Sequence, residues 1–191
     1  ASIYFVSKSH WKSKIVSEWA DFDGSSSITF SNMVSTPWTG PQGDQFLVLL
    51  AVGGFLLFWL VSPKNQESST LIGGIRLFNA KVVTMDIQHK NSPCCSEWLV
   101  SVADSSQRAL FFSLMVSDSQ ESEESKTEVD GSFKCGERAT LAWKLMKVFD
   151  LSSCPSRVAL SDISLLDVDS EGKVRFCFTK GANLCVCESN G

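Results

Sequence analysis

Three cysteines near the end of the chain, Cys177, Cys185 and Cys187, have the spacing that comes closest to a metal site. Cys185 and Cys187 would lie on one face of a strand, because side chains alternate along a strand with a period of two. A structural zinc site takes four ligands, commonly from two short Cys or His pairs, and both histidines, His10 and His89, lie far away in the sequence. We therefore predict thiols buried in strands, no metal site and no cofactor.

Catalytic chemistry has no comparable support in the sequence. Neither histidine has a Ser, Cys or carboxylate at a spacing that would define a triad, although triads are assembled in space. The segment Asp167–Gly172 lacks the spaced acids and closing Glu of a calcium loop. Gly73-Gly74 is not followed by the Lys and Ser or Thr of a phosphate-binding loop. We predict no catalytic residues and no enzymatic activity.

An acidic stretch lies within residues 118–138, with six acids and one lysine between Asp118 and Asp130. Such a stretch buries too little apolar surface to order itself, so we predict a disordered, solvated insertion over 118–138. Ser125 and Thr127, each followed three residues later by an acid, would suit an acid-directed kinase. An inert loop is the alternative interpretation.

Tryptophan is abundant, with six in 191 residues. Trp38 follows Pro37 in a predicted loop, and Trp11 lies at a predicted turn. Because tryptophan is enriched in binding hot spots, Trp38 is our first candidate for a residue that contacts a protein partner, and Trp11 is the second. Packing in the core or in a turn is the other role considered for each.

The run from Phe46 to Val61 is sixteen consecutive apolar or glycine residues. As a helix it would be about 24 Å long, whereas a bilayer core of roughly 30 Å usually needs about 20 residues. As two strands it is symmetric, because seven apolar residues lie on each side of Gly53-Gly54. Two adjacent glycines favour a type I′ hairpin turn, in which both central residues need positive φ. We favour the hairpin, and a transmembrane helix over 46–61 is the alternative.

Comparable strand patterns recur along the chain. Similar apolar stretches begin at Ser2, Phe55 and Ala109, roughly 53 residues apart, a period typical of repeated four-stranded units. Other strand candidates, separated by turn residues, accompany them. The predicted strands are 2–7, 14–22, 28–34, 46–52, 55–61, 71–78, 80–88, 98–103, 109–116, 140–149, 162–169, 173–179 and 184–187. We therefore predict an all-β fold of antiparallel four-stranded blades, with about three blade periods over residues 1–191.

Three stretches carry a resemblance to WD-repeat β-propellers: Leu50–Trp59 (LAVGGFLLFW), Ser101–Leu114 (SVADSSQRALFFSL) and Asp167–Phe178 (DVDSEGKVRFCF). The first of them resembles the second strand, tight turn and third strand of that family, ending in Trp. The Gly-His and Trp-Asp pairs of that family are missing. The resemblance implies a WD40-like β-propeller scaffold of the kind found in large intracellular assemblies, including nuclear complexes. Because four to eight blades usually close a ring, and because the chain lacks an initial Met and both its ends look like the middle of strands, we expect an incomplete ring or a fragment.

The charge and the cysteines limit the functional classes. A net charge of −4 and a pI near 5.2 do not indicate the basic surface that binds nucleic acid. Seven cysteines cannot all pair within the chain, and free thiols in apolar strands fit a reducing compartment, the cytoplasm or nucleus. We therefore favour a non-enzymatic scaffold that binds protein partners in a multi-subunit assembly. The alternative is a single-pass membrane protein with its helix at 46–61 and a β-rich soluble domain.

Overall fold

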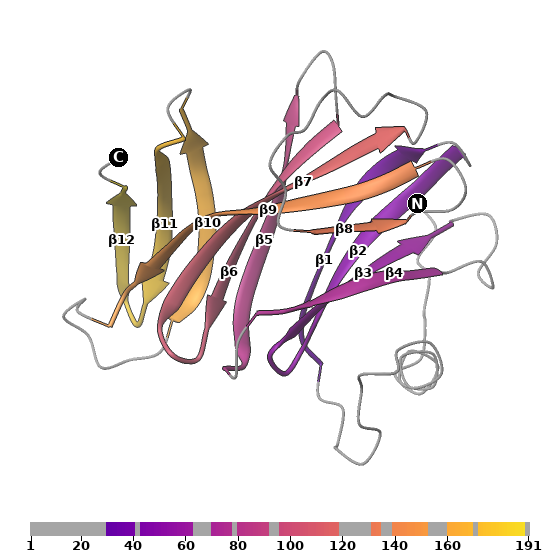
Figure 1. Cartoon of the computed structure of the whole chain (residues 1–191). Helices are drawn as coiled ribbons and strands as arrows, with labels where there is room; N and C mark the ends of the chain where they lie inside the picture. Colours follow the sequence, from indigo (N-terminus) through magenta and orange to yellow (C-terminus); the bar gives the residue numbers. More distant parts are fainter. Residues whose placement is uncertain are drawn as a thin grey trace.

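A computed structural model of the chain is built from β-strands (Figure 1). It describes residues 30–40, 43–62, 70–77, 80–91, 96–118, 131–134, 139–152, 160–169 and 172–189. Within these ranges there are twelve strands and no helix. The all-β class predicted from the sequence is therefore confirmed.

The strands form three sheets, in which every neighbouring pair of strands is antiparallel. The first sheet has the order β1 (Phe30–Gly40), β2 (Gly43–Val52), β3 (Phe55–Val61), β4 (Thr70–Arg76). The second has the order β5 (Val82–Asn91), β6 (Ser96–Asp104), β7 (Arg108–Asp118), β9 (Ala139–Asp150), β8 (Gly131–Lys134). The third has the order β10 (Leu160–Val168), β11 (Val174–Lys180), β12 (Asn183–Glu188).

The apolar run at 46–61 is a hairpin. Residues of β2 and β3 pair along their length, from Phe46 with Val61 to Val52 with Phe55. The alternative of a transmembrane helix over this run is therefore wrong, and the described part of the chain contains no helix long and apolar enough to cross a membrane.

The predicted type of turn at Gly53-Gly54 also needs correction. Gly53 has a φ of 58°, but Gly54 does not have positive φ, and positive φ at the first central residue alone is the type II′ arrangement.

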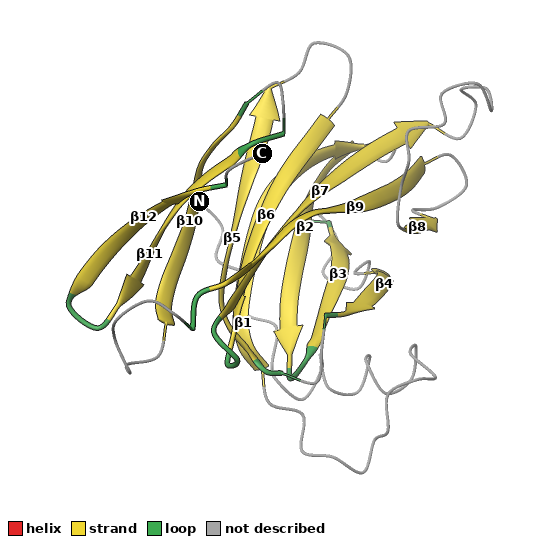
Figure 2. Cartoon of the chain, turned by 60° about the vertical axis from the view of Figure 1, so that its left-hand side comes forward, coloured by secondary structure: helices red, strands yellow, loops and turns green. Residues whose placement is uncertain are grey.

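The sheets stack face to face, and their first strands β1, β5 and β10 lie next to one another in chain order (Figures 1 and 2). One core lies between the first and second sheets, and a second core lies between the second and third sheets. Phe58 belongs to the first of these cores, whereas its neighbour Trp59 is buried on the opposite face of the first sheet. The strands of this hairpin are thus covered on both faces, which explains why their sequence does not alternate. Each of the three sheets is open, and none closes into a ring in the described residues.

Two differences from the predicted strands affect Trp38 and the predicted insertion 118–138. β1 continues to Gly40 and includes Pro37 and Trp38, which were predicted to lie in a loop. Because β1 is an edge strand, it can include a proline, which has no N–H for a further partner. β8 lies at Gly131–Lys134, inside the predicted insertion 118–138, where no strand was expected. The predicted strands at 2–7 and 14–22 and the residues Trp11, Ser125 and Thr127 lie outside the described residues.

Candidate functional site

Trp38 lies in the first core. Its side chain is 2% exposed, because alternation along β1 places Trp38 on the buried face with Thr36 and leaves Ser35 and Pro37 exposed. The indole of Trp38 stacks on that of Trp98, with 5.5 Å between ring centroids. Of the two roles considered for Trp38, packing in the core is the observed one, and this residue offers no surface to a partner.

The C-terminal cysteines lie on two different faces of the third sheet. Cys177 pairs with Val186 in register, whereas Cys185 pairs with Phe178. Cys185 and Cys187 pack against the second core, and Cys177 faces away from it together with Val186, because residues directly opposite in an antiparallel pair share a face. Among the described residues, no group of three or more His, Cys, Asp or Glu is placed to hold a metal ion.

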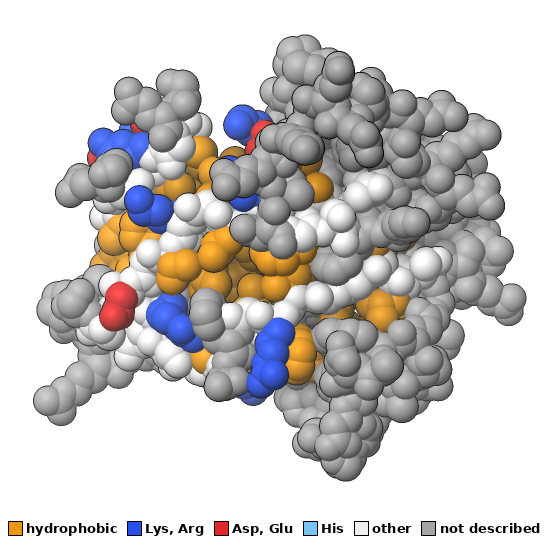
Figure 3. Space-filling view, in the orientation of Figure 1, with side chains coloured by type: hydrophobic (Ala, Val, Ile, Leu, Met, Phe, Trp, Pro, Cys, Tyr) orange, Lys and Arg blue, Asp and Glu red, His pale blue; other side chains and the backbone are white. Residues whose placement is uncertain are grey.

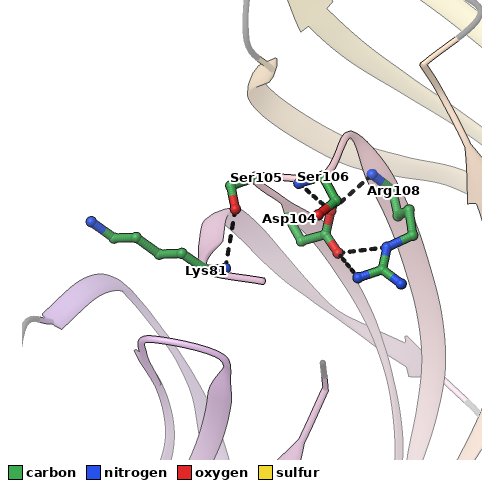
Figure 4. Close-up of polar contacts among 5 residues, drawn as sticks. All are labelled: Lys81, Asp104, Ser105, Ser106 and Arg108. Atoms are coloured by element: carbon green, nitrogen blue, oxygen red, sulfur yellow. Dashed lines mark hydrogen bonds and ion pairs between the residues drawn. The ribbon is translucent and has the colours of Figure 1, made fainter. Parts of the chain in front are cut away.

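The Asp104 carboxylate closes the turn between β6 and β7 (Figure 4). Its Oδ1 accepts hydrogen bonds from the backbone N–H groups of Ser106 at 2.9 Å and Arg108 at 3.0 Å. Its Oδ2 accepts from Nε of Arg108 at 2.8 Å and pairs with Nη2 at 2.6 Å. Next to it, Ser105 and the backbone of Lys81 exchange two hydrogen bonds. Asp104 is buried, and both its oxygens serve to shape this turn.

Lys180 and Asp86 take part in two further polar clusters, which join the second and third sheets. Nζ of the buried Lys180 donates to Oε1 of Gln107 at 2.7 Å. Oγ of Ser164 in β10 donates to Oδ2 of Asp86 in β5 at 2.9 Å. The Gln88 side chain of β5 donates to a carbonyl oxygen of β10 at 2.6 Å. These clusters hold neighbouring sheets together.

Among the residues that the structure describes, the most exposed large apolar side chains lie on β12. Leu184 is 68% exposed and Val186 is 67% exposed, and both face away from the second core. We call these two side chains, with the outer edge of β12, the β12 surface. Figure 3 shows hydrophobic side chains exposed at the end of the molecule where the third sheet lies. Apolar side chains that are exposed next to each other on one strand can contribute to contact with another molecule.

Charged pairs border the β12 surface at one end. Nζ of Lys173 lies 2.8 Å from a carboxylate oxygen of Glu188, and Nη2 of Arg175 lies 2.5 Å from Oδ2 of Asp167. The hydrogen bond from Arg175 lowers the pKa of Asp167, and the same bond raises the pKa of Arg175. An apolar centre beside a charged rim is the usual composition of a protein–protein interface.

β12 is also an edge strand of the smallest of the three sheets. The third sheet has three strands, whereas the first has four and the second has five. No described strand pairs with β12 on the side away from β11, and β12 is the outermost strand at this end of the molecule in both views (Figures 1 and 2). Main-chain groups along such an edge can pair with another strand.

The sequence predicted a strand over 184–187 but did not single out Leu184 or Val186 as contact residues. The predicted contact residues, Trp38 and Trp11, were chosen because tryptophan is enriched in binding sites. The available signal was the alternation Leu-Cys-Val-Cys in a final strand, which assigns leucine and valine to the same face.

Comparison with models of protein families gives no match. Comparison with curated proteins likewise finds no significant match.

Proposed function

We propose that this chain is a protein–protein interaction module that acts as a non-enzymatic scaffold in an intracellular assembly. The observation that carries the proposal is the exposure of Leu184 and Val186 on the β12 surface, beside the charged pairs Lys173–Glu188 and Asp167–Arg175. Exposed apolar side chains of this size, bordered by charges, are typical of surfaces that bind other proteins.

We further propose that the chain is a segment of a WD40-like β-propeller. Two features support this. The strands of the first sheet are ordered β1 to β4 along the chain, and the first strands of successive sheets are neighbours. Blades of a propeller are four-stranded sheets that are packed around a central axis and bury their faces on each other. The stacking of three sheets through two separate cores agrees with that arrangement.

The cytoplasm or nucleus is the compartment that we propose. Cys177 and Cys185 are free thiols, and both are only partly buried. Partly accessible thiols persist in a reducing environment, whereas oxidising compartments favour disulfides. We therefore expect its protein partners to be proteins of the cytoplasm or nucleus.

The test compares partner binding by the whole chain and by two variants in cells of its source. In the test variant, Leu184→Lys and Val186→Lys place two charges on the β12 surface. In the control, Met33→Lys places one charge on β1, at an apolar side chain that is 60% exposed. Proteins captured after chemical cross-linking are quantified by mass spectrometry.

We expect a defined set of proteins to be captured by the unmodified chain and by the control, and to be lost with the test variant. Circular dichroism and thermal melting establish that both variants are folded. Equal capture by all three chains would show that the β12 surface is not the binding site, and no reproducible capture by any of them would contradict the proposed function.

A further inference from the structure

We draw no further inference here: the strongest candidate, the exposed apolar side chains of Leu184 and Val186 beside the outer edge of β12 in the third sheet, carries none because nothing in the structure shows what covers it.

Discussion

Nζ of Lys180 donates a hydrogen bond of 2.7 Å to Oε1 of Gln107 and so joins β11 of the third sheet to the turn between β6 and β7 of the second. Gln107 has a φ of 61°, a conformation that few residues other than glycine adopt. Its carbonyl oxygen also accepts a hydrogen bond of 2.8 Å from the N–H of Leu151. The conformation of one turn and the packing of two sheets therefore depend on the same residue.

Replacing Lys180 with Met tests this link. Lys180 is 1% exposed, so the substitution keeps an unbranched side chain in the core but removes the donors to Gln107 and to the carbonyl of Leu151. We expect the free energy of unfolding to fall by about 1.5–3 kcal/mol, because the partly buried amide oxygen of Gln107 and the carbonyl oxygen of Leu151 lose a charged donor. Urea denaturation followed by circular dichroism measures the change.

Lys173→Met is the matched control for that substitution. Lys173 pairs with Glu188 at the surface, where their side chains are 33% and 51% exposed. An exposed pair of this kind contributes about 1 kcal/mol or less. Similar losses in the two variants would mean that the buried contacts of Lys180 do not stabilise the fold.

The sequence was sufficient to predict most of the strands, because apolar runs bounded by turn residues are local signals. Gly53-Gly54 located the β2–β3 hairpin, and the predicted third strand at 55–61 has the bounds of β3. β8 was missed because its four residues, Gly131–Lys134, show no alternation, and their structure comes from pairing with β9. Trp38 was placed in a loop because Pro37 precedes it, although an edge strand can contain a proline.

The polar clusters could not be predicted from the sequence at all. Lys180 and Gln107 are 73 residues apart, and Ser164 and Asp86 are 78 residues apart. No local spacing connects such pairs, which meet only because the sheets stack in chain order. The exposure of Leu184 and Val186 has the same origin: the strand was predictable, but its position at the end of a three-stranded sheet depends on the topology of the whole molecule.

The turn at Gly53 gives a second prediction. A Cβ added there would meet no heavy atom within 4 Å, so a substitution acts through the backbone alone. At a φ of 58°, alanine is strained, and we expect Gly53→Ala to lower the free energy of unfolding by about 1–2 kcal/mol. Gly53→Asn should cost less, because asparagine tolerates this region. A loss from Asn as large as that from Ala, measured by thermal denaturation, would contradict the backbone explanation.

The Asp167–Arg175 pair gives a prediction about pH. The hydrogen bond from Arg175 holds the pKa of Asp167 below its ordinary value of 3.8. Since the folded-state pKa is the lower one, the contribution of this pair to stability is present above the unfolded-state pKa and is lost as the pH falls through the folded-state value. We expect Arg175→Gln to raise the pKa of Asp167 toward 3.8, as followed by the carboxyl carbon shift in NMR.

Asp150 is the internal reference for that titration. Its pKa is also lowered, chiefly by the hydrogen bond from the side chain of Ser152 and then by the bond from the backbone of Ser152. Arg175→Gln should leave the titration of Asp150 unchanged. A parallel rise in both pKa values would indicate a general change of the protein rather than loss of the Arg175 contact.

Gly131 lets β8 lie against the indole of Trp143. The two residues are partners in the pairing of β8 with β9, and a Cβ on Gly131 would lie 2.7 Å from Nε1 and 2.9 Å from Cε2 of Trp143. Because the ring is rigid, Gly131→Ala must move β8 or the indole, and we expect a loss of about 1–3 kcal/mol in the free energy of unfolding. Faster amide exchange in β8 than in β7 would locate that loss.

A double substitution distinguishes this steric conflict from a general weakening of the strand. Trp143→Leu removes the ring that the new Cβ would meet, so adding Gly131→Ala to that variant should cost much less than adding it to the unmodified protein. The coupling between the two sites, obtained from urea denaturation of all four chains, should reach about 1 kcal/mol. Strictly additive losses would show that glycine is needed at 131 for a reason other than its contact with Trp143.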